Sequence, residues 1–324
     1  MGDREVSEVD RVTTDLERHL GRRVLAIRTM DEGHSGLTYW VRLDGEEGVL
    51  RLPAAGIRVA GPADVARQGR IMAALHAAGL PVPSIIAMAD QPVIDGRPFV
   101  LMEAVPGDRI EKVRDRVPAA DIAASAVEAL ARIHQLAVGQ TGLGDEEPRT
   151  LRQEVDRWSW LIERSPQELT AHAPELARRL LAHLPEGRPP ALVHGDFHYG
   201  NLLFDGSRVT AILDWEIAHV GQPLIDVGCL LLVSATGGSA DPDLAMSVPG
   251  GGGLAVPAEL LRAGYGQAET AELDWYLALN FYKLAGILGY NLMLHRRGKR
   301  DDPIYETRTE TIRKFIEEGI RWAG

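Results

Sequence analysis

Apolar positions in the first third of the chain recur in short, strand-like runs around two stretches with helical spacing. The expected strands are residues 23–30, 37–43, 48–52, 84–90 and 97–103, and the expected helices are residues 3–20 and 62–78. The polar stretches DEGHSG (31–36) and QPVIDG (91–96) have the composition of turns between strands. We therefore predict a small antiparallel sheet with a helix packed on it.

After Pro106-Gly107 the apolar spacing becomes mainly helical. Helices are expected over residues 118–138, 150–164, 173–184, 223–235, 257–266, 271–295 and 303–322, with one short hairpin over 202–213. The Gly- and Pro-rich stretch 237–257 is expected to be a mobile surface loop without a packed element. A boundary near Glu103 would divide the chain into residues 1–103 and 104–324.

Length and composition agree with a globular protein of two parts. The 324 residues exceed what most single cores hold, and 45% hydrophobic and 25% charged residues are ordinary values. No apolar run approaches the roughly 20 residues that span a bilayer, and the N-terminal residues lack the apolar stretch of a secretory signal. The single cysteine, Cys229, cannot form an internal disulfide. We expect a soluble, cytoplasmic protein, monomeric or homodimeric, without a membrane partner.

The charge of the chain argues against one class of function. A net charge of −11 is unlike the basic surface of a nucleic-acid-binding protein. An acidic surface that keeps the protein in solution is the simpler interpretation, and a pocket for a cationic substrate is the alternative. Lysine is scarce: it occurs only at positions 112, 283, 299 and 314.

Three polar side chains flank the predicted hairpin. Asp196 and Asn201 precede its first strand in HGDFHYGN, and Asp214 follows its second strand. Because a hairpin brings the outer ends of its strands together, these side chains are expected to approach one another. Carboxylate and amide oxygens suit Mg²⁺, and a carboxylate that does not bind the metal can accept a hydrogen bond from an attacking hydroxyl. The set therefore indicates phosphoryl transfer.

The same residues resemble known motifs. His194-Gly195-Asp196, with Asn201 five residues after the aspartate and a later Asp214-Trp215-Glu216, is similar to the motifs of the aminoglycoside phosphotransferase and choline kinase group. GHSGLTYWV, PFVLMEAVPGD, GLPVPSII and QPLIDVG also resemble stretches of that group. In place of the HRD and DFG signatures of protein kinases the sequence has HGD and DWE, with no equivalent of the APE signature after them, which favours a small-molecule acceptor.

The resemblance implies an α+β, protein-kinase-like fold with two lobes: a small antiparallel-sheet N-lobe with one helix, and a larger, mainly helical C-lobe. It also implies roles for individual residues. Asp196 would accept the substrate proton, and Asn201 and Asp214 would bind Mg²⁺. The nucleotide, ATP or GTP, would be bound by Arg51, His34, Ser35, Gly36, Glu103 and Val105. His194, Asp226 and Gln68 would give structural support, and Trp215 and Glu216 would lie near the substrate.

Two positions depart from the usual pattern of the group. Arg51 stands where a lysine is usual, and Gln68 stands where a helix glutamate would pair with it. Arginine keeps the charge and can bind phosphate oxygens in a bidentate manner. A neutral glutamine is a weaker partner than a carboxylate, so the pattern leaves open whether Arg51 is ordered before nucleotide binds.

Rival interpretations differ in the chemistry that they assign. His194 and His198 could form a zinc pair, but no third cysteine or histidine is close in sequence, and GHSGL lacks the second glycine of a serine nucleophile elbow. A kinase-like nucleotide-binding module without activity is the other class. We expect an active kinase that transfers the γ-phosphate to a small-molecule hydroxyl.

The acceptor is left open by the sequence. Similarity to domains fused to acyl-CoA dehydrogenases suggests a hydroxyacyl thioester. An aminoglycoside, macrolide or nucleoside antibiotic is the alternative, and the activity would then confer antibiotic resistance. The basic run HRRGKR (295–300) could reach coenzyme A phosphates or could simply be a solvated helix end.

Overall fold

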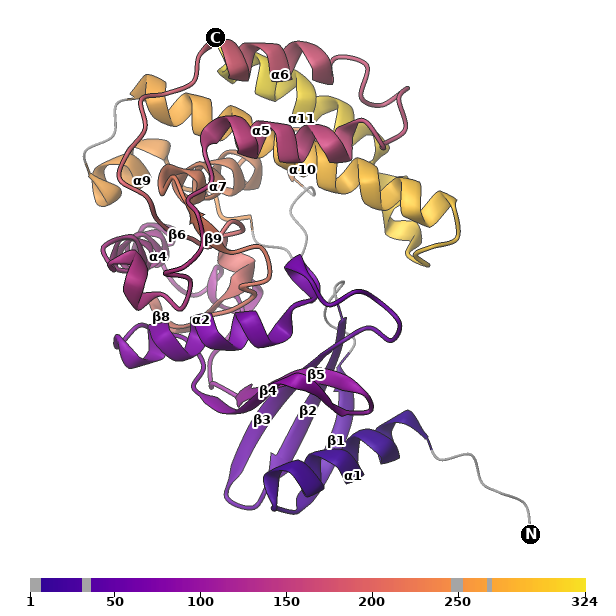
Figure 1. Ribbon diagram of the computed structural model, residues 1–324. Helices are drawn as coiled ribbons and strands as arrows, with labels where there is room; N and C mark the ends of the chain where they lie inside the picture. The colour runs from indigo at the N-terminus through magenta and orange to yellow at the C-terminus, as the bar shows by residue number, and fades with distance from the viewer. Residues whose placement is uncertain (1–6, 31–35, 246–252, 267–269) are drawn as a thin grey trace. The chain divides into compact units, whose positions relative to one another are not determined.

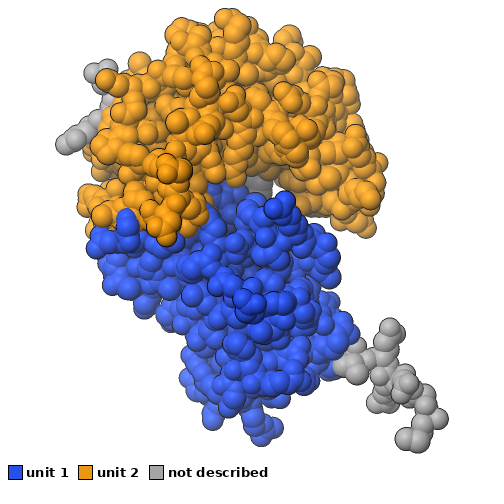
Figure 2. All heavy atoms as spheres, viewed as in Figure 1, with its two compact units in different colours: residues 1–107, 139–142, 210–217 blue, residues 108–138, 143–209, 218–324 orange. Residues whose placement is uncertain are grey.

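The computed structural model describes residues 7–30, 36–245, 253–266 and 270–324 (Figure 1). The chain forms two compact units (Figure 2). The first unit comprises residues 1–107 with 139–142 and 210–217, and the second comprises 108–138, 143–209 and 218–324. Two short segments from later in the sequence therefore complete the first unit, so the units are not simply consecutive in the chain.

A five-stranded antiparallel sheet forms the core of the first unit, with strand order β1-β2-β3-β5-β4 (Figure 1). The strands are β1 (Val24–Met30), β2 (Gly36–Leu43), β3 (Glu46–Pro53), β4 (Ile85–Ile94) and β5 (Arg97–Glu103). In β2 and β3, side chains at alternate positions are buried in one apolar core, which includes Tyr39, Val41, Leu50 and Leu52. This period of two is the pattern that the sequence shows.

The expected turn over residues 91–96 is shorter than predicted. Strand β4 continues to Ile94, and only Asp95 and Gly96 lie between it and β5. Both residues have positive φ, 46° and 69°, as a two-residue type I′ hairpin turn requires. The Asp-Gly pair was the relevant signal, and the Gln-Pro pair at 91–92 was misread as part of the turn.

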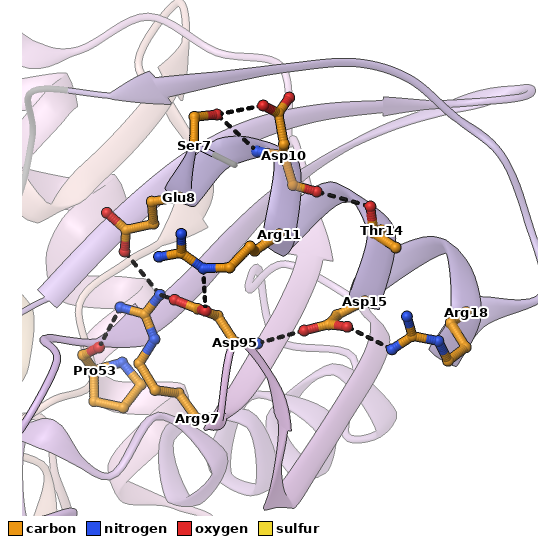
Figure 3. A network of polar contacts seen from close by, with 10 residues as sticks. All are labelled: Ser7, Glu8, Asp10, Arg11, Thr14, Asp15, Arg18, Pro53, Asp95 and Arg97. Carbon is orange, nitrogen blue, oxygen red and sulfur yellow. Dashed lines mark hydrogen bonds and ion pairs between the residues drawn. The ribbon is translucent and has the colours of Figure 1, made fainter. Parts of the chain in front are cut away.

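Helix α1 (Glu8–Leu20) packs on this sheet through the buried residues Val12 and Leu16. A polar network at the side of the helix includes Arg97, whose side chain is only 7% exposed (Figure 3). Arg97 Nη2 donates to Glu8 Oε1 and to Asp95 Oδ2, each at 2.8 Å. Its two carboxylate partners tie the first turn of α1 to the β4–β5 turn.

Helix α2 (Val65–Ala77) starts later than expected. Pro62 lies in a 3₁₀ turn (Gly61–Ala63), and Asp64 then caps the helix by accepting a hydrogen bond from the Arg67 amide at 2.9 Å. Aspartate is a favoured N-cap because it satisfies an amide that has no partner in the first turn. The cap, rather than the proline, therefore determines where α2 begins.

The second unit is mainly helical (Figure 1). Its longer helices are α4 (Ala119–His134), α5 (Leu151–Ile162), α6 (Ala173–Ala182), α7 (Leu224–Gly237), α9 (Ala258–Tyr265), α10 (Thr270–Arg296) and α11 (Thr309–Trp322). The 27-residue α10 packs against α5, α7 and α11. No described helix is long and apolar enough to cross a membrane.

Several short elements were not predicted. Helix α3 (Ile110–Val113) precedes α4, and α8 (Pro242–Ala245) lies in the stretch that was expected to hold no packed element. The segment 303–308 is a 3₁₀ turn ahead of α11 rather than its first turns. Residues 246–252 of the expected loop lie outside the described residues.

Four short strands flank the HGD motif. Strand β6 (Ala191–Val193) pairs antiparallel with β9 (His219–Gly221), and three residues are too few to give a periodic signal in the sequence. The expected hairpin is present as β7 (Leu202–Asp205) and β8 (Arg208–Ile212). His194 follows β6 directly, so the motif begins where a buried strand ends.

Candidate functional site

A buried carboxylate holds the loop that follows β6. Asp226, in the first turn of α7, accepts hydrogen bonds from the backbone amides of His194 and Gly195, each at 2.8 Å. His134 Nε2 lies 3.1 Å from Asp226 Oδ2, and His134 Nδ1 lies 2.7 Å from the Tyr265 hydroxyl. Burial raises the pKa of Asp226, but the hydrogen bonds and positive charge of its partners outweigh burial and lower it. Asp226 is therefore an anionic anchor for the loop.

Gly195 turns the backbone between this anchor and Asp196. Its φ of 85° lies in the region that glycine adopts without steric cost. His194 Nδ1 accepts the Asp196 amide at 3.2 Å, and His198 Nδ1 accepts the Gly200 amide at 3.1 Å. These two rings therefore use a nitrogen each to hold the loop itself. This arrangement speaks against the zinc pair, and the described residues contain no cluster of three His, Cys, Asp or Glu suited to a metal ion.

Lys283, on α10, is a partner of Asp196 that the sequence reasoning missed. Its Nζ donates to Asp196 Oδ1 at 2.8 Å and to the carbonyl oxygen of Gly195. The lysine side chain is 2% exposed, whereas that of Asp196 is 32% exposed. The available signal was a lone charged residue inside the mainly apolar helical stretch 276–288. Such a residue needs a compensating charge.

The second oxygen of Asp196 faces other groups of the same loop. His198 Nε2 lies 3.4 Å and Asn201 Nδ2 lies 3.5 Å from Asp196 Oδ2. Burial raises the pKa of Asp196, but the charges of Lys283 and His198 outweigh burial and hold this pKa well below its usual value. Asp196 is thus a carboxylate anchored at one oxygen and still a third exposed. It can accept a hydrogen bond from a hydroxyl group.

The first unit contains a second charged cluster, centred on Arg51 of β3. Arg51 Nη1 donates to Gln68 Oε1 and to Asp214 Oδ1, both at 3.2 Å. Its Nη2 lies 3.7 Å from Glu216 Oε2. The expected contact with Gln68 is therefore present, and two carboxylates join it. The open question of how Arg51 is ordered is answered by these carboxylates, which the sequence did not connect with it.

The segment Asp214-Trp215-Glu216 has an unusual backbone. Asp214 has a φ of 63°, which is uncommon for a residue with a side chain and is best tolerated by Asp and Asn. Trp215 is 1% exposed, and its Nε1 donates to the Ile212 carbonyl oxygen at 3.1 Å. A buried indole with its donor satisfied favours a packing role for Trp215 over the expected place near the substrate. Glu216 faces Arg51.

The structure describes only some of the other residues that were expected to bind the nucleotide. Glu103 ends β5, and its side chain accepts a hydrogen bond from Ser84 Oγ at 2.8 Å, while Val105 follows two residues later. Gly36 begins β2, where an added Cβ would lie 2.4 Å from the Leu52 carbonyl oxygen, so packing alone requires glycine there. His34 and Ser35 lie outside the described residues. Their expected role stays a prediction, as do the roles of Gly36, Glu103 and Val105.

The residues assigned to magnesium have suitable chemistry. Asn201 Nδ2 donates a hydrogen bond to the Asp196 carbonyl oxygen at 2.9 Å. The side-chain oxygen of Asn201 could therefore serve as a ligand for a cation. Asp214 has a side chain 40% exposed and supplies a carboxylate. Mg²⁺ usually binds only one or two such protein oxygen ligands, and phosphate and water oxygens complete its coordination shell. Asn201 and Asp214 belong to different units, so their approach stays a prediction.

Solved structures share this fold. A crystal structure from Ralstonia eutropha JMP134, assigned provisionally as an aminoglycoside phosphotransferase, has a TM-score of 0.78 at 24% identity, covering 96% of this chain and 98% of that one. Aminoglycoside phosphotransferase APH(4)-Ia, a thermostable mutant in ternary complex with AMP-PNP and hygromycin B, has a TM-score of 0.64 at 17% identity, covering 95% and 98%. The expected α+β, kinase-like fold is thereby confirmed.

Sequence comparisons agree with the fold. Acyl-CoA dehydrogenase family member 10 from Mus musculus is 30% identical over 284 residues, which are 80% of this chain and 25% of that protein. The chain thus spans about a quarter of the length of this relative. The model of the phosphotransferase enzyme family matches residues 26–276. These residues include nearly all of the sheet, the HGD loop and the first turns of α10, and the chain belongs to the phosphotransferase enzyme family.

Proposed function

We propose that the chain is a small-molecule kinase that transfers the γ-phosphate of ATP, or of GTP, to a hydroxyl group. The observation that carries this proposal is the state of Asp196: ionised, anchored through Oδ1, and a third exposed beside Asn201. Membership of the phosphotransferase enzyme family supports the reaction type. The relative bound to AMP-PNP supports an adenine nucleotide as the donor.

In this proposal the two clusters supply different parts of the reaction. Asp196 orients the acceptor hydroxyl and receives its proton as the oxygen attacks the γ-phosphorus. Arg51 contacts phosphate oxygens, and Asn201 and Asp214 hold Mg²⁺, which would neutralise charge that develops on the phosphates. Glu103 and Val105 present backbone groups to the base, and Asp226 keeps the loop in shape. The resemblance suggests all these roles, and the local contacts support those of Asp196, Arg51 and Asp226.

Two acceptor classes follow from the relatives. The sequence similarity to an acyl-CoA dehydrogenase family member supports a hydroxyacyl thioester, and we take this as the first candidate. A relative that is crystallised with hygromycin B supports an antibiotic as the second candidate. The run 295–300 adds little to the thioester case. Arg296 binds Glu306 at 2.8 Å and Glu168 at 3.2 Å, as expected of a helix end rather than of a phosphate site.

Nucleotide binding and transfer can be tested separately. Calorimetry with AMP-PNP should show binding that requires Mg²⁺ and that Asp214→Ala abolishes or weakens at least tenfold. ADP release from magnesium–ATP should then be screened with hydroxyacyl thioesters of coenzyme A, hygromycin B, a macrolide and a nucleoside antibiotic. Asp196→Asn serves as the matched control. Magnesium-independent binding, or transfer that Asp196→Asn leaves unchanged, would contradict the proposed function. Binding without transfer to any acceptor would favour the inactive module.

A further inference from the structure

Lys283 occupies a place where a charged side chain is costly. It projects from α10, which packs against α5, α7 and α11, and its side chain is 2% exposed. Buried lysines are rare unless a partner of opposite charge compensates them. Burial alone would lower the pKa of Lys283, and the Asp196 carboxylate outweighs burial and raises it. The lysine is therefore kept charged by the residue that we assign to the reaction.

Both acceptors of Lys283 belong to the HGD loop. They are the carbonyl oxygen of Gly195 and Oδ1 of Asp196. The neighbouring thiol of Cys229 is not a counterion, because burial raises its pKa to about 12. The negative charge of Asp226 also acts on Lys283, but the oxygens of Asp226 accept hydrogen bonds from the loop amides and contact His134. Asp196 is thus the carboxylate that Lys283 contacts directly.

The loop is held on two sides by α7 and α10. Asp226 from α7 binds the amides of His194 and Gly195, and Lys283 from α10 binds the carbonyl group and the carboxylate that follow. An ion pair that served only the core would bury both charges. Here the lysine is buried, and the carboxylate keeps an exposed edge. The contact therefore fixes the orientation of a group that still faces outward.

We propose that Lys283 is a positioning residue for phosphoryl transfer, which holds Asp196 through Oδ1 so that the rest of the carboxylate faces the acceptor hydroxyl. This inference rests on the proposed function. In the transfer, the hydroxyl oxygen forms a bond to the γ-phosphorus and the bond to the β–γ bridging oxygen breaks. ADP leaves with those electrons, and the hydroxyl proton passes to Asp196. Lys283 neither gives nor takes a proton and acts only through Asp196.

The first test compares two lysine variants. Lys283→Met should lower kcat by roughly a hundredfold, the scale of a misplaced catalytic group, with KM for ATP within twofold. Lys314→Met is the matched control, since Lys314 lies on α11 and binds Asp241 and Asp243 at 2.7 and 2.6 Å. Its kcat should stay within twofold of the wild type. The acceptor is one found by the screen above, or water where the screen yields none. A kcat for Lys283→Met within threefold of the wild type overturns the proposal.

A second variant covers the case in which Lys283→Met does not fold. Removing both charges, as in Asp196→Asn with Lys283→Met, leaves no unpaired charge in the core and should raise the melting temperature above that of Lys283→Met alone. If Lys283 acts through Asp196, adding Lys283→Met to Asp196→Asn should change kcat by less than twofold. A loss as large as in the wild-type background would show that Lys283 supports the fold in general, and would overturn the positioning role.

Hydrogen exchange separates this inference from the proposed function. Amides of the segment 194–201 should exchange at least tenfold faster in Lys283→Met than in the wild type, and at wild-type rates in Lys314→Met. If the wild type fails to bind magnesium–ATP by calorimetry, the proposed function fails, and the exchange rates still decide whether Lys283 holds the loop. Unchanged exchange in Lys283→Met counts against the proposal whatever the activity.

Discussion

The two charged clusters pair a cation with carboxylates in opposite arrangements. In the first unit, Arg51 has a side chain 15% exposed and faces Asp214 and Glu216, which are more exposed than it is. In the second unit, Lys283 is fully buried and the Asp196 carboxylate is the exposed partner. The named residues of each cluster all belong to one unit.

The difference shows how burial decides what an ion pair can do. An arginine at a partly open site can exchange its carboxylates for phosphate oxygens, because water and ligand can reach it. A lysine in the core cannot leave its partner without a large desolvation cost, so it can only hold that partner in place. We infer that the Arg51 cluster is a binding site, and that the Lys283 contact is a fixed support.

Asp196, the proposed base, should give the strongest response to substitution. Asp196→Asn should lower the rate of phosphoryl transfer by about 10²–10⁴-fold, the usual contribution of a general base. Magnesium–nucleotide affinity should change by less than threefold. Single-turnover transfer and calorimetry with AMP-PNP measure the two quantities.

Asp196→Asn also tests the ion pair between Asp196 and Lys283. The sequence alone predicts no effect of Asp196→Asn on stability. The ion pair with Lys283 changes this expectation: the variant should lose about 1.5–3 kcal/mol of unfolding free energy, the range for hydrogen bonds to charged groups. A urea titration of the variant with a midpoint equal to that of the wild type would show that the pair contributes nothing to stability.

Substitution of Asp226, the buried anchor of the HGD loop, should lower the stability of the protein. Asp226→Asn removes a fully buried charge that accepts three hydrogen bonds, and it should cost about 3–5 kcal/mol of unfolding free energy at neutral pH. Denaturant titration measures this loss. An Asp226→Asn protein with wild-type stability would contradict the anchoring role.

The pH dependence of stability gives an independent check on Asp226. Its pKa in the folded protein lies below the ordinary 3.8, so the carboxylate contributes its full share of stability above that pH. This share is lost as the pH falls through the lowered pKa. The wild type should therefore lose more stability than Asp226→Asn when the pH is reduced below about 3.8. Parallel curves of stability against pH for the two proteins would indicate that Asp226 has the same pKa in the folded and unfolded states.

The phosphate contact of the first unit should have a smaller effect. Arg51→Met should weaken magnesium–ATP binding by about 1.5–3 kcal/mol, the loss of a charge-assisted hydrogen bond. It should leave stability almost unchanged, because the carboxylates that it pairs with are partly exposed. If KM and kcat both stay within twofold, another residue holds the phosphates.

The smallest effect tests which partners order Arg51. Gln68→Ala removes a neutral acceptor and should cost about 0.5–1.5 kcal/mol of nucleotide affinity or less, since Asp214 and Glu216 still hold the guanidinium. Glu216→Gln is the companion variant. An effect of Gln68→Ala as large as that of Arg51→Met would show that α2, rather than the segment 214–216, orders the arginine.

The strands of the first unit, the long helices and the HGD loop could be predicted from the sequence alone. Local signals were sufficient there: alternation in β2 and β3, helical spacing in α10, and a tight cluster of motif residues. The family followed from that cluster, because HGD, Asn201 and DWE lie within 23 residues of one another. The start of α2 and the length of β4 were misjudged, since Pro62 and Gln91-Pro92 are compatible with more than one local structure.

Which charged side chains meet depends on the packing of distant parts of the chain. Lys283 lies 87 residues from Asp196, and Glu216 lies far along the chain from Arg51, so no local pattern connects them. Pairing of this kind depends on which side chains are buried together, and burial follows from packing rather than from spacing. The sequence supplied a lone lysine in an apolar helix, and the fold placed it behind the carboxylate that it holds.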